Sequence, residues 1–281
     1  MLVINKIQSL QNKIHKLKQS KKKIGFVPTM GALHKGHSSL LRQAREECDV
    51  VVLSIFVNPK QFSPREDFKQ YPRAFKQDKM LAQKEQVDII FHPTADEIYP
   101  TNYLTLIKVL DITNTLCGKD RPTHFDGVTT VVGKLLNIVS PDILYLGQKD
   151  AQQAVVIRRM IGDLNFPVKV RICPTVREAD GLALSSRNKY LTARQRKEAT
   201  VLYRSLKAAK KKILNGTQTA AQIKSFIKSM IARESSGKID YIACVDAQTL
   251  TPISRFKGNV MIALAIRFNK TRLIDNIVFR I

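Results

Sequence analysis

Residues 26–40 read Phe-Val-Pro-Thr-Met-Gly-Ala-Leu-His-Lys-Gly-His-Ser-Ser-Leu, and this stretch decides the fold class. The apolar residues 24–27 are typical of a short buried strand, and apolar positions at helical spacing begin at Leu40. Between them, Gly31 and Gly36 would let a ligand approach the backbone closely. In doubly wound α/β folds, ligands bind where a parallel strand ends and the next helix begins. The stretch therefore predicts a strand, a binding loop and a helix.

Strand-like and helical stretches alternate over the first 175 residues. Apolar spacing predicts helices over residues 7–17, 73–86 and 128–139. Further strands are expected at residues 50–57, 87–92, 104–110, 142–146 and 168–173. This alternation predicts α/β architecture, with a Rossmann-like, doubly wound parallel sheet in a domain of residues 1–175.

The pattern changes in the remaining residues, 176–281. A long helix is expected from residue 192 to about 213, ending at Asn215 and Gly216, and a second helix over 220–233. Strand-like runs follow at 239–246, 259–268 and 273–281. Helices followed by consecutive strands predict a second, smaller α+β C-terminal domain with an antiparallel sheet.

The composition is that of a globular protein with a large excess of positive charge. Of 281 residues, 47 are Lys or Arg and 23 are Asp or Glu, so the formal net charge is +24. A basic balance attracts nucleic acids, anionic membranes and phosphate-bearing substrates alike. A nucleic-acid-binding module would cluster basic and aromatic residues on one surface. Aromatic residues are only 7% here, Trp is absent and Lys and Arg are spread along the chain, which disfavours that class.

Cysteine usage and hydropathy bear on location. The four cysteines form no CxxC pair, which disfavours a zinc site and favours reduced, partly buried thiols. The N-terminus lacks the uninterrupted apolar core of a signal peptide. No stretch approaches the roughly 18 apolar residues of a membrane span. A cytoplasmic protein with no membrane partner is expected.

The two histidines of the binding loop indicate its ligand. His34 and His37 are three residues apart, so both imidazoles can face one anion from the first helical turn. The N–H groups and the positive dipole end of a helix N-terminus also favour phosphate. The alternative is a turn with two exposed histidines.

The His-Lys-Gly-His sequence at 34–37 resembles the HIGH signature of the nucleotidyltransferase superfamily, which includes class I aminoacyl-tRNA synthetases. The longer string around it is similar to the pantoate–β-alanine ligase family. Four more segments carry this resemblance in the family's order: FVNPKQF at 56–62, DFKQYPR at 67–73, YLGQKDAQQ at 145–153 and READGLALSSRN at 177–188. Leu184, where the family usually has Met, and Thr123, where it often has Gly, are departures.

The resemblance implies a two-step ligation with ATP as substrate and Mg²⁺ as cofactor. Pantoate attacks the α-phosphate of ATP to give pantoyl adenylate and pyrophosphate, and β-alanine then displaces AMP to form pantothenate. The partners implied are these small molecules and a second copy of the chain in a homodimer, with no specific nucleic acid. Residues 1–175 would bind nucleotide and pantoate, and residues 176–281 would form a lid.

Site residues follow from the resemblance by matching position. The catalytic set would be His34, His37, Lys149, Ser185, Ser186 and Arg187. ATP would contact Met30, Gly31, Ala32, Leu33, His34, Lys35, Gly36, His37, Gly147, Gln148, Lys149, Asp150, Val176, Leu184, Ser185, Ser186 and Arg187. Pantoate would contact Gln61, Gln153 and Asn58, with Tyr71 nearby, and β-alanine would contact Gln61.

Structural alternatives exist for several of these residues. Ser185 to Arg187 could cap a helix, Lys149 could be a solvated lysine, and Gln61 could be an ordinary loop residue. Arg121 and His124 could lie beside the active site or be structural.

Other positions and one rival enzyme class also remain open. His15 and His92 are expected to be structural, and Asp78 is a candidate Mg²⁺ ligand, although the metal ligands as a set are not identified. A nucleotidylyltransferase or another adenylating enzyme could use the same HxGH residues. FVNPKQF and the pair Gln61 and Gln153 argue against that rival.

Overall fold

The computed structural model describes residues 1–63, 68–217 and 219–281. Packing divides the chain into two compact units. The first unit comprises Met1–Asn114, Gly118–Gly147 and Val156–Pro174, and the second comprises Thr115–Cys117, Gln148–Val155 and Thr175–Ile281. Two short upstream segments thus pack with the C-terminal region, which a single sequence boundary does not anticipate. The division into functional domains at residues 175 and 176 stays a prediction.

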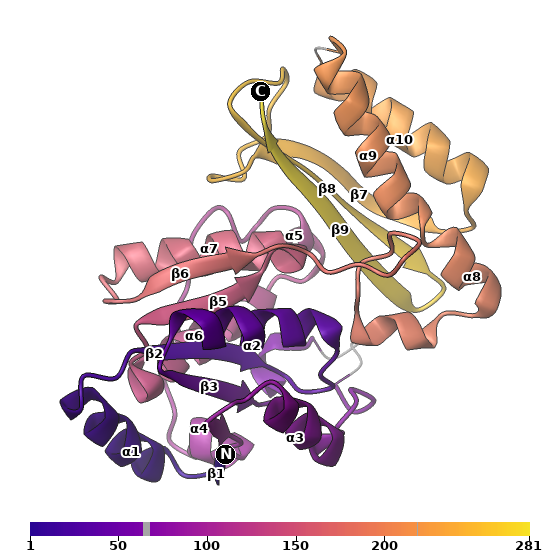
Figure 1. Ribbon diagram of the computed structural model, residues 1–281. Coiled ribbons are helices and arrows are strands. Elements are labelled where there is room, and N and C mark those ends of the chain that lie inside the picture. Colours follow the sequence, from indigo (N-terminus) through magenta and orange to yellow (C-terminus); the bar gives the residue numbers. More distant parts are fainter. Residues whose placement is uncertain (64–67, 218) are drawn as a thin grey trace. The chain divides into compact units, whose positions relative to one another are not determined.

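A six-stranded parallel sheet forms the centre of the first unit (Figure 1). Its strands are β1 (Leu2–Ile4), β2 (Ile24–Thr29), β3 (Val50–Ile55), β4 (Ile89–Phe91), β5 (Ile143–Gly147) and β6 (Lys169–Cys173), in the order β1-β4-β3-β2-β5-β6. From β2 the chain adds β3 and β4 on one side and β5 and β6 on the other. The topological switch point is therefore at the carboxyl ends of β2 and β5, where doubly wound folds bind ligands.

Helices cover both faces of this sheet, which confirms the doubly wound class. The helices are α1 (Ile7–Gln19), α2 (Lys35–Glu47), α3 (Phe75–Lys84), α4 (Ala95–Ile98) and α6 (His124–Val139), with a short 3-10 turn, η1 (Pro59–Gln61). Helices α2 and α3 pack on the face that carries Val27, Val51 and Leu53. Because side chains alternate along a strand, Phe26 and Val52 point to the other face, where α6 contacts β2 and α1.

The strand expected over residues 104–110 is wrong. This segment has no regular secondary structure and pairs with no strand among the described residues. Its backbone is held by the side chains of α6 instead: Ile107 N–H donates to Thr130 Oγ1 at 2.9 Å, and Thr129 Oγ1 donates to Ile107 O at 2.6 Å. The hydroxyls of Thr129 and Thr130 take the place of the backbone hydrogen bonds that a neighbouring strand would supply. An alternating apolar pattern cannot distinguish this arrangement from a strand.

An antiparallel three-stranded sheet dominates the second unit, with two helices on one face (Figure 1). The elements are η2 (Gln148–Asp150), η3 (Ser186–Tyr190), α8 (Ala193–Glu198), α9 (Val201–Leu214), α10 (Ala220–Glu234), β7 (Lys238–Asp246), β8 (Asn259–Phe268) and β9 (Thr271–Arg280). Helices α5 (Cys117–Asp120) and α7 (Ala151–Asp163) contain residues of both units. Apolar side chains of α9 and α10 bury one face of the sheet. This is the smaller α+β region that the sequence predicts.

The single helix expected over residues 192–213 is two helices. Thr192 caps α8: its side chain accepts the Gln195 N–H, and the Gln195 side chain accepts the Thr192 N–H. The chain then turns at Ala199 and Thr200 before α9 begins. Ala199 is fully buried, so the break is packed against the core. The expected end of the longer helix is confirmed, because α9 ends at Leu214 and Gly216 has the left-handed φ of +100°.

No helix among the described residues combines the length and the apolar character that crossing a membrane requires.

Candidate active site

The turn after β2 orients both histidines of the HxGH sequence. His34 caps α2: its Nδ1 accepts the Gly36 N–H at 3.1 Å, and the His37 Nδ1 accepts the His34 N–H at 3.2 Å. A ring nitrogen that accepts an N–H carries no proton, so each ring has its proton on Nε2. The two rings lie 4.2 Å apart, centroid to centroid. Two Nε2–H donors at a helix N-terminus suit a phosphate.

Asp78 of α3 holds the loop that precedes these histidines. Its Oδ2 and Oδ1 accept the N–H groups of Ala32 and Leu33 at 3.0 and 2.7 Å. Gly31 has φ +80°, and a Cβ there would lie 2.9 Å from Asp78 Oδ2. Burial raises the pKa of Asp78 above its usual value, while the two backbone donors act in the opposite direction. Asp78 therefore positions the loop, and both carboxylate oxygens are occupied by the backbone.

Two buried amides connect the next loop to the first. Gln61 Nε2 lies 2.9 Å from Met30 Sδ, and Gln61 Oε1 accepts from Asn58 Nδ2 at 3.2 Å. Asn58 Nδ2 also donates to the Gly127 carbonyl of α6 at 3.0 Å. Gln61 is 8% and Asn58 1% exposed, so Gln61 is no ordinary surface loop residue. The proposed pantoate residues Asn58 and Gln61 thus lie directly beside the proposed ATP residue Met30.

Arg121 and His124 hold the backbone of the same loop. Arg121 donates to His124 Nε2 at 3.1 Å, so that nitrogen accepts and the ring proton is on Nδ1. His124 Nδ1–H then donates to the Gln61 carbonyl at 2.8 Å, and Arg121 donates to it as well, at 3.3 Å. The sequence left these two residues open between a structural role and the active site. Both bond the Gln61 carbonyl, so they hold the backbone of a candidate site residue.

Tyr99 supports the loop and was not identified from the sequence. Its hydroxyl donates to Asn58 Oδ1 at 2.9 Å. Burial raises the pKa of Tyr99 well above its ordinary value, with the neighbouring Tyr103 adding to the effect. The phenol therefore stays protonated and remains a donor. Nothing in the sequence around Tyr99 and Pro100 indicates this role.

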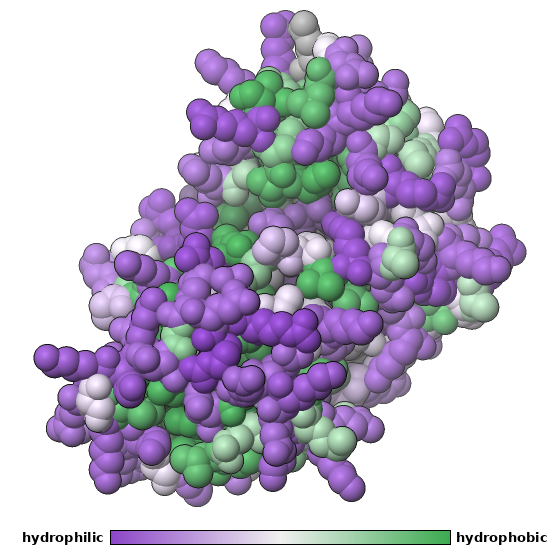
Figure 2. All heavy atoms as spheres, in the orientation of Figure 1, coloured by the Kyte–Doolittle hydropathy of each residue, from purple (hydrophilic) through white to green (hydrophobic). Residues whose placement is uncertain are grey.

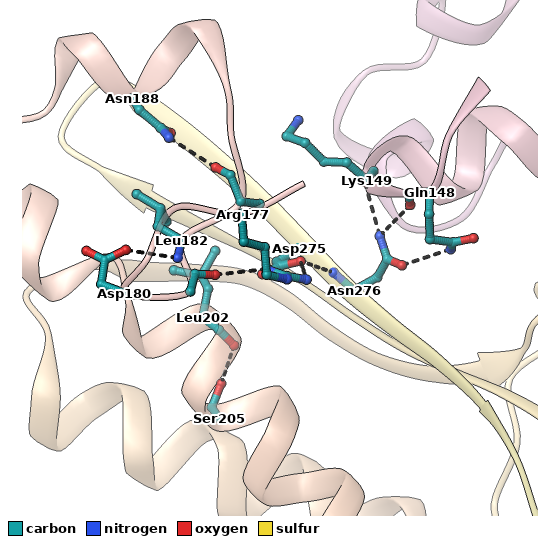
Figure 3. Close-up of polar contacts among 12 residues, drawn as sticks. Gln148, Lys149, Arg177, Asp180, Leu182, Asn188, Leu202, Ser205, Asp275 and Asn276 are labelled. Atoms are coloured by element: carbon teal, nitrogen blue, oxygen red, sulfur yellow. Dashed lines mark hydrogen bonds and ion pairs between the residues drawn. The ribbon is translucent and has the colours of Figure 1, made fainter. Parts of the chain in front are cut away.

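In the second unit, Lys149 lies on a turn that hydrogen bonds from β9 hold in place. Asn276 of β9 donates to the carbonyls of Gln148 and Lys149 at 2.9 and 3.1 Å, and its Oδ1 accepts from Gln148 Nε2 at 2.9 Å. Figure 3 shows the Lys149 side chain extending away from Asn276. Its ammonium is 3.7 Å from the Asp150 carboxylate, and the side chain is 23% exposed. Lys149 is therefore partly buried rather than freely solvated.

The serine pair has a local structural role. Ser185 caps η3, because its Oγ accepts the Arg187 N–H at 3.3 Å. Asn188 Nδ2 donates to the Ala183 carbonyl at 3.0 Å. Ser185 thus caps a short 3-10 turn, while Thr192 caps the helix that follows. The cap leaves the Ser185 hydroxyl able to donate elsewhere. Ser186 and Arg187 are half-buried in the same turn.

The structure groups the expected site residues by unit. In the first unit, hydrogen bonds connect the β2–α2 loop, η1 and the start of α6; Tyr71 is buried nearby, its ring 5.8 Å from Phe62. In the second unit, Asp275 and Asn276, in the middle of β9, bond Arg177, Gln148 and Lys149 (Figure 3). The turn η3, which contains Ser186 and Arg187, also contacts β9. Gln153 is half-buried on α7. Asp67, quoted with the family segment, lies outside the described residues.

The two other histidines make local contacts within the first unit. His92 Nδ1 bonds the Ile55 carbonyl at 2.8 Å and its ring stacks on Phe75 with centroids 4.3 Å apart. His15 Nε2 lies 2.9 Å from Gln19 Nε2 along α1.

Neither metal ligands nor reactive thiols are gathered in the described residues. No group of three or more His, Cys, Asp or Glu side chains there could hold a metal ion. With both Asp78 oxygens bonded to backbone N–H groups, these residues do not fit a protein-built Mg²⁺ cage. All four cysteines are free and buried, and burial raises the pKa of Cys173 and Cys244 to about 11. A thiol nucleophile has no support in this geometry.

Polar side chains cover most of one face of the molecule. Figure 2 shows hydrophilic residues over most of the visible face, with apolar residues in separate areas.

Comparison with known proteins identifies the family. The family model described as pantoate-beta-alanine ligase matches residues 2–278. A pantothenate synthetase from Caldicellulosiruptor saccharolyticus is 52% identical over 281 residues and both whole chains. One from Thermotoga neapolitana is 50% identical over 278 residues, or 99% of each chain.

Solved structures agree with the sequence relatives. The pantothenate synthetase of Thermus thermophilus is 42% identical, with a TM-score of 0.94 over 99% of both chains. A pantoate-beta-alanine ligase from Francisella tularensis, complexed with beta-gamma ATP and beta-alanine, is 38% identical. Its TM-score is 0.80 over 99% of this chain and 97% of that one. With the family model covering nearly every residue, this chain is an enzyme that belongs to the pantoate–β-alanine ligase family.

Proposed function

We propose that this enzyme condenses (R)-pantoate with β-alanine to pantothenate through pantoyl adenylate, releasing pyrophosphate and then AMP. In the first step, a pantoate carboxylate oxygen forms a bond to the α-phosphorus of ATP, and the bond to pyrophosphate breaks. In the second step, the amine nitrogen of β-alanine bonds to the acyl carbon, loses one proton, and AMP leaves. This reaction serves pantothenate, and hence coenzyme A, biosynthesis.

The observation that carries the proposal is the neutral histidine pair on the β2–α2 turn. His34 and His37 are fixed through Nδ1, which leaves Nε2–H as the donor of each ring. Negative charge grows on the pyrophosphate oxygens as the bond breaks, and fixed donors stabilise that charge without reorganisation. Lys149, Arg187 and the hydroxyls of Ser185 and Ser186 would supply further donors to the triphosphate.

The nucleotide as a whole would contact residues from the turn after β2 and the turn after β5. Met30 to His37 would follow its phosphates, Gly147 and Gln148 would approach through the backbone, and Asp150 would accept from the ribose. Val176 and Leu184 would lie against adenine. Mg²⁺ would enter with ATP, held by phosphate oxygens and water, since the described residues do not form a cage for it.

The buried amides suit a small hydroxy acid. Each amide both donates and accepts, so Gln61 and Gln153 could bond the hydroxyl and carboxylate groups of pantoate, with Asn58 fixing Gln61. β-Alanine would enter beside Gln61. The Francisella tularensis relative, complexed with beta-gamma ATP and beta-alanine, supports these substrates for this chain.

Three further properties belong to the proposal. The acyl adenylate is sensitive to water, so residues 176–281 would act as a lid. The family relationship supports a homodimer. Four buried free thiols are typical of a reducing compartment, which supports the cytoplasm.

Substrate omission tests the reaction. Purified enzyme with ATP, pantoate and β-alanine should form AMP and pyrophosphate over many turnovers. ATP–pyrophosphate exchange should require pantoate but not β-alanine. Transfer of AMP to a lasting nucleotide product would indicate a nucleotidylyltransferase instead. Tight binding of single or double strands at physiological salt, without AMP formation, would support the nucleic-acid-binding class.

A further inference from the structure

Two adjacent polar residues interrupt the apolar strand β9. Asp275 and Asn276 are 2% and 4% exposed, and they pair with Leu264 and Ala263 of β8. Burying polar side chains in a sheet is costly unless they are hydrogen-bonded. The contacts they make there show what the two side chains do.

The two side chains point to opposite faces of the sheet. Neighbours on a strand alternate, and Leu273, Ile277 and Phe279 lie in the core beneath α9 and α10. Asp275 therefore shares the helix-covered face with them. Asn276 points to the other face, where the turn Gln148–Asp150 lies (Figure 3).

Asn276 fixes the peptide that carries Lys149. Its amide donates to two successive carbonyls, those of Gln148 and Lys149, and its oxygen accepts from the Gln148 amide. All the polar atoms of the Asn276 side chain are used on this turn. The direction in which the Lys149 side chain leaves the backbone is thus set by one residue of β9.

Asp275 fixes the start of the segment that ends in Ser185 to Arg187. Arg177 binds both Asp275 oxygens, at 2.6 and 2.9 Å, and also donates to the Gly181 carbonyl at 3.1 Å. The Arg177 guanidinium stacks on Tyr203, 3.7 Å from the ring centroid. The Asp275 and Arg177 side chains are 1% and 15% exposed, so the pair is largely dry.

The anchored end is tied directly to the return leg of the segment. Arg177 forms an isolated antiparallel bridge with Ala183, and the Leu184 N–H donates to the Val176 carbonyl at 3.0 Å. Holding Arg177 therefore sets where Leu184 and the serines after it emerge.

We propose that Asp275 and Asn276 are positioning residues for adenylation: Asn276 holds the Lys149 turn on one face of the sheet, and Asp275 on the other face holds Arg177 at the start of the segment that leads to Ser185–Arg187. The position of Lys149 relative to Ser185–Arg187 is thereby set by two neighbouring residues of β9. This inference rests on the proposed function, in which both groups contact the triphosphate. Misplacing a reacting or stabilising group by about 1 Å can cost roughly 10²-fold in rate.

The main test is Asn276→Asp, which keeps the shape but turns a carboxylate oxygen toward two carbonyls. ATP–pyrophosphate exchange with pantoate should fall by about 10²-fold in kcat, while kcat/KM for β-alanine in the full reaction changes less than about twofold. Hydrogen exchange should rise over residues 147–150. If Asn276→Asp does not fold, the neutral Asn276→Ala carries the same prediction.

A double variant separates positioning from stability. Asp275→Asn should lower both thermal stability and pyrophosphate exchange. Replacing the pair by apolar residues, Arg177→Met with Asp275→Leu, should restore much of the stability, as buried ion pairs often allow. Exchange should remain low, because the Arg177 bond to the Gly181 carbonyl is then lost. Recovery of exchange together with stability would overturn the inference.

Asp240→Asn is the control, since Asp240 forms a partly buried ion pair with Arg272 in the same unit, at 2.7 Å and 16% and 15% exposed. It should lower stability and leave exchange kinetics within about twofold. Equal loss of exchange in this control, or normal exchange in folded Asn276→Asp, would contradict the positioning role alone. Wild-type enzyme without any pantoate-dependent exchange would instead contradict the proposed function.

Discussion

The His37 Nδ1 accepts the backbone N–H of His34 at 3.2 Å, so each histidine of the pair is part of the other's turn. One ring nitrogen builds the helix start, and the other carries the proton that can reach a ligand. In each ring, Nδ1 thus holds the turn and Nε2 carries the proton for the proposed phosphate contact.

Asn and Ala substitutions separate these two nitrogens. His34→Asn places an oxygen near the Nδ1 position and should keep the cap, whereas His34→Ala should lose about 1 kcal/mol of stability. Both remove the Nε2–H donor, so both should lower kcat by about 10²-fold. Thermal melts and steady-state kinetics measure the two effects. Near-normal kcat in His34→Asn would remove the proposed phosphate contact.

Lys149→Ala and His37→Ala should each lower kcat by about 10²-fold or more, because each removes a donor to the developing pyrophosphate charge. The measurement is ATP–pyrophosphate exchange. Lys16→Ala, at an exposed lysine of α1 that lies outside the proposed site, is the comparison and should lose far less. Unchanged exchange in the first two variants would assign the triphosphate to other residues.

Gly127 allows α6 to approach η1. A Cβ there would clash with the Lys60 carbonyl oxygen and lie 2.7 Å from Gln61 N, and these are backbone atoms that cannot rotate away. Gly127→Ala should destabilise the protein by about 1–3 kcal/mol and raise the KM for pantoate. In α7, a Cβ on Gly162 meets nothing within 4 Å. Gly162→Ala should be neutral or stabilising by up to about 1 kcal/mol; equal effects of the two changes would contradict the close approach.

Asp78→Asn should loosen the β2–α2 loop. An Asn side chain can accept from only one of the Ala32 and Leu33 N–H groups and turns its NH₂ toward the other. The KM for ATP should rise by about tenfold, consistent with loss of a charge-assisted hydrogen bond of roughly 1.5–3 kcal/mol.

The same variant gives a pH dependence with a defined sign. The folded-state pKa of Asp78 is raised, mainly by burial, so its contribution to stability is full below the usual carboxyl pKa and is lost as pH rises through the folded value. Asn does not titrate. Wild type should therefore gain stability relative to Asp78→Asn as pH falls from 7 toward 4 in urea unfolding. A difference that shrinks over this range would mean that the Asp78 pKa is lowered.

The buried thiols should be inert at neutral pH. With a pKa of about 11, Cys173 and Cys244 have a thiolate fraction on the order of 10⁻³ at pH 8. Iodoacetamide should leave both unmodified in the folded enzyme, by mass spectrometry, with activity retained. Rapid loss of activity on alkylating either one would contradict this.

The parallel sheet and the main binding loop could be predicted because their signals are local. Strand-like runs alternate with helical spacing, and the two histidines sit where a strand-to-helix turn must be. The strand over 104–110 was wrong for an equally physical reason: Thr129 and Thr130 of α6 replace the ladder, and such pairing is not visible in a period of two.

The supporting residues could not be predicted with the same success. Tyr99 bonds Asn58 at long sequence separation, and nothing near it in the chain indicates this contact. Arg121 was singled out beside the site, but its bond to the Gln61 carbonyl could not be predicted. A signal for Asp275 and Asn276 did exist, because two polar residues inside an apolar strand need partners. Arg177 and Gln148, those partners, lie about 100 residues or more away along the chain.

The central claim is attack of a pantoate carboxylate on the α-phosphate of ATP, and oxygen-18 transfer tests it most directly. Pantoate labelled in both carboxyl oxygens, with unlabelled ATP and β-alanine, should deliver one labelled oxygen to the phosphate of AMP and retain the other in the amide of pantothenate. Labelled inorganic phosphate together with ADP, or AMP free of label, would contradict it.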